Sequence, residues 1–341
     1  MNPQILLAGI MLVAVVLYCL LAGADFGAGF WDLLCSGPRA KQQRDTIAHA
    51  IQPIWETNHV WLILVVVLMF EGFPEAFTAI TVGLAVPVFL ILLGIVLRGS
   101  SYVFRAYFAG RVYTQLYWGK VFSISSCFTP LFLGIVIGAI SSDTVVVTDG
   151  IPQQGWLGTW FHPFPVLVGV LALSLFAYLS ACYLTLESDD PQLQEDFRRR
   201  ALFSGFVSLL TAFGTYAAAG NFAMEIRDGL SRAPYVWLVE VVAAGASLIA
   251  FHGLWVRHYR RARIAAALQV GLIVAGWGVA QFPYLVRPNL TIEGTSAPTN
   301  LLVDVEIACA LGAVILFPSL YLLFRIFKAH RTLAATENPI A

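Results

Sequence analysis

The chain has 341 residues, of which 59% are hydrophobic and only 12% are charged, and its formal net charge is zero. Because a soluble domain carries about 25% charged residues, this composition excludes an ordinary soluble protein and indicates an integral membrane protein. Zero net charge gives no electrostatic basis for binding nucleic acid, and the five cysteines form no Cys-x-x-Cys pair that would indicate a metal or redox site. We therefore expect an all-α polytopic membrane protein that forms a single domain over residues 1–341.

Nine segments are apolar over lengths that suit a bilayer, whose hydrocarbon core needs about 20 helical residues. We expect transmembrane helices at residues 4–33, 53–73, 75–97, 119–141, 164–186, 201–223, 235–255, 264–284 and 301–324. The first segment lacks the basic start and the cleavage site of a signal peptide, so we expect it to stay in the protein. The connections are short and no internal repeat is visible, which predicts one helical bundle without a soluble domain.

The first predicted helix carries an acid inside a run of small residues, LAGADFGAG at residues 21–29. Glycines spaced by four residues, such as Gly23 and Gly27, let membrane helices approach one another closely, and Gly29 follows them. Helix packing alone would explain the glycines. Asp25 is harder to explain, because a carboxyl group inside a membrane is costly and is usually functional. The sequence leaves open whether Asp25 lies inside a long tilted helix or at its cytoplasmic border.

The second predicted helix begins with a polar cluster, because Glu56, Asn58 and His59 come directly before an apolar run at residues 60–70. Those eleven residues are too few to cross a bilayer, so the helix has to include the polar cluster. Two interpretations of Glu56 remain open. It is either a first-turn acid that complements the helix dipole at the membrane surface, or a carboxyl group in the cytoplasmic leaflet that takes up and releases protons.

Basic residues are distributed unevenly between the two sides of the predicted bundle. Seventeen of the 20 Lys and Arg residues follow odd-numbered helices or lie in the C-terminal tail, while Arg227, Arg232 and Arg287 lie on the opposite side. The positive-inside rule therefore predicts an N-terminus outside the cytoplasm and a C-terminus inside it. The basic stretch at residues 257–263 fits a cytoplasmic helix end better than a nucleic-acid patch.

Two arginines, Arg98 and Arg105, follow the third predicted helix on the same side as Asp25 and Glu56. Each of them either pairs with one of those acids or contacts lipid phosphates. The six histidines include no pair spaced by four residues on one helix, and none lies in the middle of a predicted span. We therefore expect this chain to bind neither haem nor a metal ion.

Four motifs follow one another along the chain: LAGADFGAG, PIWETNHVWLI, RGSSYVFRAYF and GWGVAQFPYLVRP. Their order and spacing resemble subunit II of the cytochrome bd-type quinol oxidases, and the resemblance covers nearly the whole chain. Its most specific part is the pattern Trp-acid-x-Asn-x-Val-Trp. The matched residues are Trp55, Glu56, Asn58 and Trp61 in that pattern, and Asp25, Gly27 and Gly29 in the glycine motif.

The resemblance implies two four-helix bundles plus one peripheral helix, in the bacterial inner membrane. It implies an obligate partner, subunit I, which holds haems b and d and the site that oxidises quinol, the substrate of the complex. This chain would then be the haem-free subunit that supports subunit I and contributes to proton delivery from the cytoplasm while oxygen is reduced to water. Some members of the family also hold a quinone in subunit II. The sequence assigns no residues to a quinone and does not reveal whether a small accessory membrane subunit is present.

One departure from the family pattern bears on the proton path, because the family often has an acid where this chain has Ala22. A path that uses that acid is absent or rerouted here, which places more weight on Asp25 and Glu56. Two other functions remain open. Asp25 and Glu56 would couple protons to a substrate in a secondary transporter, although internal repeats and broken helices, which are typical of transporters, are not visible. A purely structural scaffold for a partner subunit is the other alternative.

Overall fold

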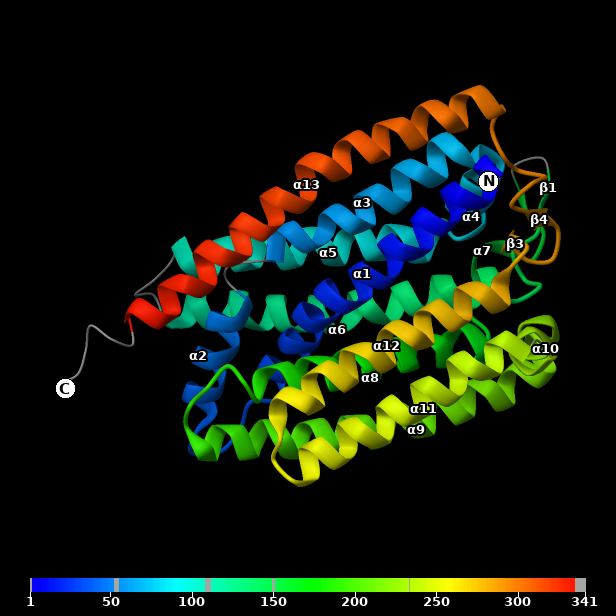
Figure 1. Cartoon of the computed structure of the whole chain (residues 1–341). Coiled ribbons are helices and arrows are strands. Elements are labelled where there is room, and N and C mark those ends of the chain that lie inside the picture. Colours follow the sequence, from blue (N-terminus) through cyan, green and yellow to red (C-terminus); the bar gives the residue numbers. More distant parts are fainter. Residues whose placement is uncertain (1, 52–54, 108–111, 149–150, 233, 335–341) are drawn as a thin grey trace.

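The computed structural model describes residues 2–334 apart from 52–54, 108–111, 149–150 and 233. Its long helices run side by side along one axis (Figure 1). They are α1 (Pro3–Leu33), α3 (Trp55–Gly72), α5 (Ala85–Tyr107), α6 (Val112–Ser141), α8 (Pro163–Leu184), α9 (Pro191–Phe222), α11 (Pro234–Trp255), α12 (Tyr259–Gln281) and α13 (Thr299–Ala334). The shorter elements are α2 (Ala40–Ile51), α4 (Pro74–Gly83), α7 (Gly155–Gly158), α10 (Met224–Arg232), β1 (Val147–Thr148), β2 (Ile151–Pro152), β3 (Tyr284–Val286) and β4 (Leu290–Thr291).

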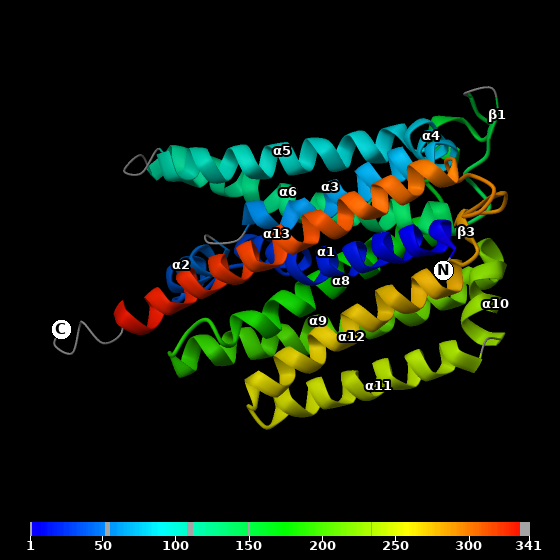
Figure 2. The same cartoon turned by 45° about the horizontal axis from the view of Figure 1, so that its top comes forward.

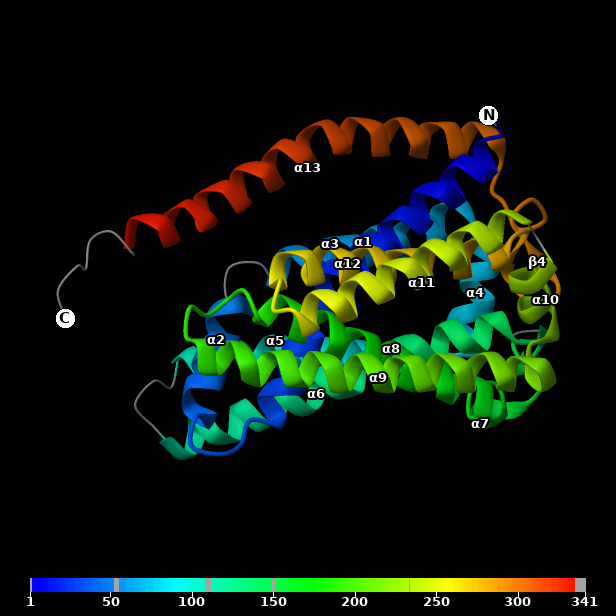
Figure 3. The same cartoon turned by 60° about the horizontal axis from the view of Figure 1, so that its bottom comes forward.

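Eight of the nine long helices named above form two groups of four. The first bundle consists of α1, α3, α5 and α6, and the second bundle consists of α8, α9, α11 and α12. Helix α1 also contacts α8 and α12, so it joins the two bundles. Helix α13 packs on α1 and α3 and lies along the edge of the molecule, where Figure 3 shows it apart from the other helices. The expected all-α architecture, two four-helix bundles plus one peripheral helix, is confirmed.

The two ends of the bundle differ in the elements that close them (Figures 1 and 2). One end carries α2, the start of α9 and the turn between α11 and α12, and we refer to it as the α2 end. The other end carries α7, α10 and two antiparallel hairpins, β1–β2 and β3–β4, and we refer to it as the hairpin end. Helix α1 begins at the hairpin end, and the last described turn of α13 lies toward the α2 end.

Eight described helices are long and apolar enough to cross a membrane, and the bent pair α3–α4 makes a ninth candidate. The third predicted span, 75–97, is wrong in its bounds. Helix α4 has 10 residues, too few to cross a bilayer, and it is bent by 118° from α3 next to Pro74. The spanning helix is α5, which begins at Ala85 and continues to Tyr107.

The longer α5 changes the place of two arginines. Arg98 and Arg105 were expected in a cytoplasmic loop at residues 98–118, but both lie inside α5. The loop expectation is wrong for most of that range, because α6 already begins at Val112. The apolar run ends at Leu97 and is followed by the charged Arg98, a pattern that is typical of the end of a transmembrane helix.

Candidate functional site

The acid of α1 and the amide of α3 meet inside the first bundle. The Asn58 amide nitrogen donates a hydrogen bond to a carboxylate oxygen of Asp25. Asn58 is buried and Asp25 is partly buried. The sequence singled out both residues, and the packing of α1 on α3 brings them into contact. Away from water, such a carboxylate needs a polar partner, and Asn58 supplies one.

Arg98 of α5 places a positive charge next to this pair. Its side chain is 1% exposed, and its Nε donates to the Ser126 hydroxyl of α6 at 3.1 Å. The guanidinium group lies over the rings of Phe26 and Phe122, 4.8 and 5.0 Å from their centroids. The opposite charges of Arg98 and Asp25 attract each other across the interface of α5 and α1. Arginine suits this place because its flat cation stacks on aromatic rings while it donates hydrogen bonds.

Several polar atoms of this cluster have no hydrogen-bond partner among the described residues. They are Nη2 of Arg98, the hydroxyl oxygen of Tyr18 and Nδ1 of His59. The His59 ring lies 6.1 Å from the ring of Tyr18 and 6.0 Å from that of Phe26. Buried polar groups in proteins are usually paired, so several such atoms in one place indicate a functional cluster or one that takes up water.

The glycines of the motif make this arrangement sterically possible. A Cβ atom on Gly27 would lie 2.0 Å from the backbone oxygen of Phe176 in α8, so this glycine lets α1 and α8 touch. A Cβ atom on Gly29 would lie 2.2 Å from the hydroxyl oxygen of Ser126. Gly29 therefore makes the room in which Ser126 holds Arg98.

Two further motif residues lie in an apolar cluster beside the charges. Trp61 is 6% exposed and packs in one core cluster with Phe176 and Ala22. Ala22 is 1% exposed, so the place where the family often has an acid is filled here by a small apolar residue. Trp55 and Glu56 begin α3, but their side chains lie outside the described part of the structure.

A second buried acid, Asp32, was not among the residues expected from the sequence. It is 5% exposed, and the Ser123 hydroxyl donates to its Oδ2 at 2.6 Å. Nη1 of Arg105 lies 3.8 Å from the same oxygen, so Arg105 pairs with this acid. Oδ1 of Asp32 has no hydrogen-bond partner among the described residues. The signal for Asp32 was its spacing, because it follows Asp25 by two helical turns on the same face of α1.

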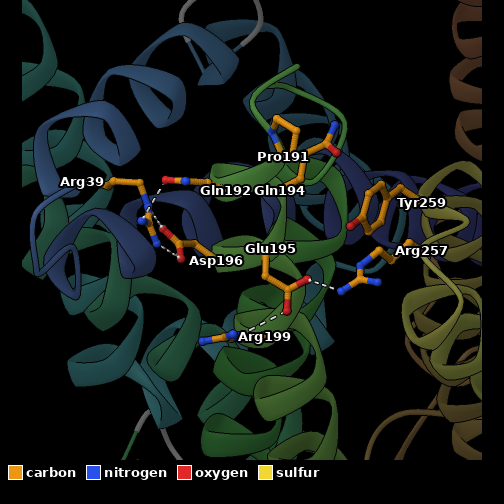
Figure 4. A pocket seen from close by; sticks show the side chains of 9 residues that line it. All are labelled: Arg39, Pro191, Gln192, Gln194, Glu195, Asp196, Arg199, Arg257 and Tyr259. Carbon is orange, nitrogen blue, oxygen red and sulfur yellow. Dashed lines mark hydrogen bonds and ion pairs between the residues drawn. The ribbon is translucent and has the colours of Figure 1, made fainter.

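A hollow of about 660 Å³ lies at the α2 end (Figure 4). Arg39, from the connection between α1 and α2, contacts Asp196 of α9 at 2.7 Å. Glu195 binds Arg199 at 3.2 Å and Arg257 at 3.4 Å. The acids of this hollow are therefore already paired with arginines. The cluster ties two connections of the chain, α1–α2 and α11–α12, to the start of α9.

The metal-ligating side chains of the described residues form no group of three His, Cys, Asp or Glu that could hold a metal ion. The buried cluster of the first bundle consists instead of a carboxyl group, an amide, a guanidinium group and hydroxyl groups, with a second carboxyl group toward the α2 end. A carboxyl group that is held by an amide and balanced by a nearby cation can exist with or without its proton. The chemistry that this arrangement supports is therefore proton transfer.

Comparisons with known proteins agree over nearly the whole chain. A sequence model of the family described as cytochrome bd terminal oxidase subunit II matches residues 3–327. The chain is 26% identical over 340 residues to the putative cytochrome bd menaquinol oxidase subunit II of Bacillus subtilis, an alignment that covers 95% of each chain. It is 21% identical over 363 residues to cytochrome bd-I ubiquinol oxidase subunit 2 of Escherichia coli, covering 94% of this chain and 93% of that one.

A solved structure shares the fold. It is described as the structure of bd oxidase from Geobacillus thermodenitrificans, and one of its chains matches with a TM-score of 0.77 at 24% sequence identity. The match covers 96% of this chain and 99% of that chain. The arrangement of helices is therefore shared from end to end.

Proposed function

Because the chain belongs to the cytochrome bd terminal oxidase subunit II family, we propose that it is the haem-free subunit of a membrane-bound quinol oxidase and delivers protons toward its partner. As a subunit II it has a haem-bearing subunit I as its partner and is part of an oxidoreductase complex. Reduction of oxygen to water consumes protons, so such a complex needs a route for them through the membrane. The observation that carries the proposal is the contact of Asp25 with Asn58 beside the buried cation of Arg98.

The chemistry of this cluster fits a proton relay. An ionisable group inside a membrane is costly and is usually functional. The Asn58 amide holds the Asp25 carboxylate in place, and Arg98 balances its charge when it is ionised. When a proton arrives, Asp25 becomes neutral and the cation remains packed on Phe26 and Phe122. The site therefore tolerates both protonation states of one carboxyl group, which a relay requires.

We place the α2 end in the cytoplasm, so the N-terminus is periplasmic. The uneven distribution of Lys and Arg, 17 of 20 on one side of the predicted topology, supports this orientation. Asp25 lies in the last third of α1, toward that end. Glu56 lies in the first turn of α3, two residues before Asn58, and we assign it the transfer of protons from the cytoplasm to Asp25.

A proton-coupled transporter is the alternative that shares these acids. Transporters of that kind bind substrate where broken helices meet near the middle of the membrane. The bent pair detected among the described helices, α3–α4, has its bend next to Pro74, toward the hairpin end. Asp25 and Asn58 lie toward the other end, so the bend and the acid do not form one site. This separation favours the oxidase subunit.

The experiment is Asp25→Asn in the complete oxidase complex, with Asp45→Asn as the matched control, because Asp45 is an exposed acid of α2. We expect oxygen consumption driven by quinol, per haem, to fall at least about tenfold, since positioned proton-transfer groups commonly contribute 10²–10⁴-fold. Haem content should stay normal. Glu56→Gln should slow turnover in the same way, and Glu56→Asp should keep part of it. Unchanged turnover in a normally assembled Asp25→Asn complex would overturn the proposal.

A further inference from the structure

Asp32 lies between the buried cluster and the α2 end of the bundle. Its Oδ2 accepts a hydrogen bond from Ser123 and lies 3.8 Å from Arg105, whose side chain is 30% exposed. Its Oδ1 is buried with no hydrogen-bond partner among the described residues. Oδ2 is thus held by Ser123 and lies near Arg105, a side chain that reaches the surface. Oδ1 can still accept a hydrogen bond.

Asp32 and Asp25 lie on one face of α1. Asp25, Gly29 and Asp32 are spaced by four and three residues, so they form one stripe on the helix. The two acids are about 10 Å apart along the axis, too far for direct proton transfer. Gly29 occupies the middle of the stripe, and Ser126 of α6 lies against it, 2.2 Å from where a Cβ atom would be.

Two hydroxyl groups of α6 lie along this stripe, Ser123 at Asp32 and Ser126 against Gly29. Ser123 donates to Asp32, and Ser126, one turn further along α6, accepts from Nε of Arg98 next to Asp25. Each serine also donates to a carbonyl four residues earlier, at 2.9 Å for Ser123 and 2.7 Å for Ser126. Ser123 thus has two acceptors, Asp32 and the carbonyl of Gly119, between which its proton can turn.

We propose that Asp32 is a second group, besides Glu56, that collects protons at the α2 end, and that Ser123 and Ser126 pass its protons inward to Asp25. This inference rests on the proposed function, because it supplies protons to the same relay. In each transfer a serine hydroxyl gives its own proton forward and takes one from behind, so its charge is unchanged. At the end Asp32 has lost a proton and Asp25 has gained one. Arg98 keeps its charge throughout and holds Ser126 in place.

A purely structural role is the alternative explanation for Asp32. In that case the carboxylate would serve to tie α1 to α5 and α6 through Arg105 and Ser123. The pair with Arg105 is long, however, and water screens it on the side of the arginine, which is 30% exposed. A structural anchor also has no reason to leave one buried carboxylate oxygen without a partner.

The ionisable groups around Asp32 come from several elements. Arg105 faces it from α5, and the Cys35 thiol lies close to it just beyond the end of α1. Arg44 of α2 and Arg200 of α9 lie next to Cys35 in turn. The three arginines carry a positive charge and cannot take up a further proton. The carboxyl group of Asp32 is therefore the group at this place that can collect protons.

The test uses the complete oxidase with its partner subunit and compares Asp32→Asn with Asp32→Glu and with the control Asp45→Asn. We expect Asp32→Asn to lower oxygen consumption per haem several-fold and to leave haem content unchanged. The deficit should grow between pH 6 and pH 8.5, because protons become scarcer as pH rises. Asp32→Glu should restore most of the rate, and a small weak acid such as formic acid should partly rescue Asp32→Asn. Asp45→Asn should behave as the unsubstituted complex.

The outcomes separate this inference from the proposed function. If Asp25→Asn is slow and Asp32→Asn is not, the inference fails and the relay at Asp25 stands. If neither is slow, the proposed function fails. A deficit in Asp32→Asn that is equal at every pH and is not relieved by weak acid assigns Asp32 a structural role and overturns the inference. If Asp32→Asn does not assemble, Ser123→Ala decides in the same assay, because it removes one hydroxyl and leaves the pair with Arg105.

Discussion

The two bundles of this protein bury polar groups in different ways. In the first bundle, charged and amide side chains are paired across helices, as Asp25 of α1 is with Asn58 of α3 and Arg98 of α5 is with Ser126 of α6. In α8, α9, α11 and α12, none of the described Asp, Glu, Lys or Arg side chains is fully buried. The second bundle buries one amide, Gln281 of α12, which donates to the backbone oxygen of Ile140 in α6. Its other buried polar side chains carry hydroxyl groups, most of which donate to a carbonyl of their own helix. The hydroxyls of that kind include Thr185, Ser204 and Ser208.

This difference has a physical cause and a consequence for function. A hydroxyl group is satisfied by the helix that carries it, so it places no demand on the neighbouring helices. A buried charge is tolerated only where other helices bring partners to it. Because it is costly inside a membrane, such a charge usually serves a function. On the proposed function, the first bundle carries the chemistry, and the second bundle is the scaffold that supports α1 through α8.

The largest effect is expected from removing the charge of Arg98. Arg98→Met keeps much of the packing on Phe26 and Phe122 but leaves Asp25 without its cation. Removing one of two interacting buried charges costs up to about 3–5 kcal/mol, so we expect the purified complex to unfold at a clearly lower temperature and to lose haem. The control is Arg199→Met in the second bundle, where a 74% exposed arginine pairs with Glu195 and about 0–1 kcal/mol is expected. Equal unfolding temperatures for the two variants would contradict the difference between the bundles.

A smaller effect is expected at the joint between the bundles. Gly27→Ala would place a methyl group 2.0 Å from the backbone oxygen of Phe176, so α1 and α8 have to move apart. Overpacking of this kind typically costs about 1–3 kcal/mol, measured as a lower unfolding temperature of the complex. Gly9→Ala in the same helix is the matched control, because no atom lies within 4 Å of the added methyl group. Alanine there should be neutral or stabilising, since glycine weakens a helix by about 0.5–1 kcal/mol. A Gly27→Ala complex as stable as Gly9→Ala would show that the close approach of α1 and α8 is not required.

The sequence predicted the helices better than the contacts between them. Long apolar runs identify α1, α8 and α11 closely, because hydropathy acts along one segment at a time. Helix α9 begins ten residues before the predicted 201, because Asp190 caps it with a hydrogen bond to Gln192 that hydropathy does not register. The break at Pro74 was missed because apolar residues continue on both sides of it.

The candidate site was predicted in its residues but not in its partners. Asp25 and Asn58 were singled out separately, since each is polar within an apolar segment. Their contact depends on which helices pack together, and no pattern within one segment contains that information. Arg98 was placed in a loop because its partners, the rings and the hydroxyl group that surround it, come from α1 and α6. Asp32 was missed for the same reason, because its partners come from α5 and α6.

The smallest effect is expected at Ser208, which is compared with Ser126 because the two serines differ in one respect. Ser126 of the first bundle and Ser208 of the second are both buried, and each donates to a carbonyl four residues earlier, at 2.7 and 2.8 Å. Ser126 also accepts a hydrogen bond from Arg98, and Ser208 has no charged partner among the described residues. Ser126→Ala removes the acceptor of a buried cation, for which about 1–3 kcal/mol and a slower turnover per haem are expected.

Ser208→Ala should change stability by about 1 kcal/mol or less and leave oxygen consumption unchanged, because its carbonyl partner is already bonded within the helix. Unfolding temperature and turnover of the two variants, measured side by side in the assembled complex, test whether function belongs to the first bundle. If Ser208→Ala slows turnover as much as Ser126→Ala, the second bundle takes part in the chemistry and is more than a scaffold. If both are silent, the hydrogen bond from Arg98 to Ser126 has no role in proton transfer, and the way from Asp32 to Asp25 does not run through that hydroxyl group.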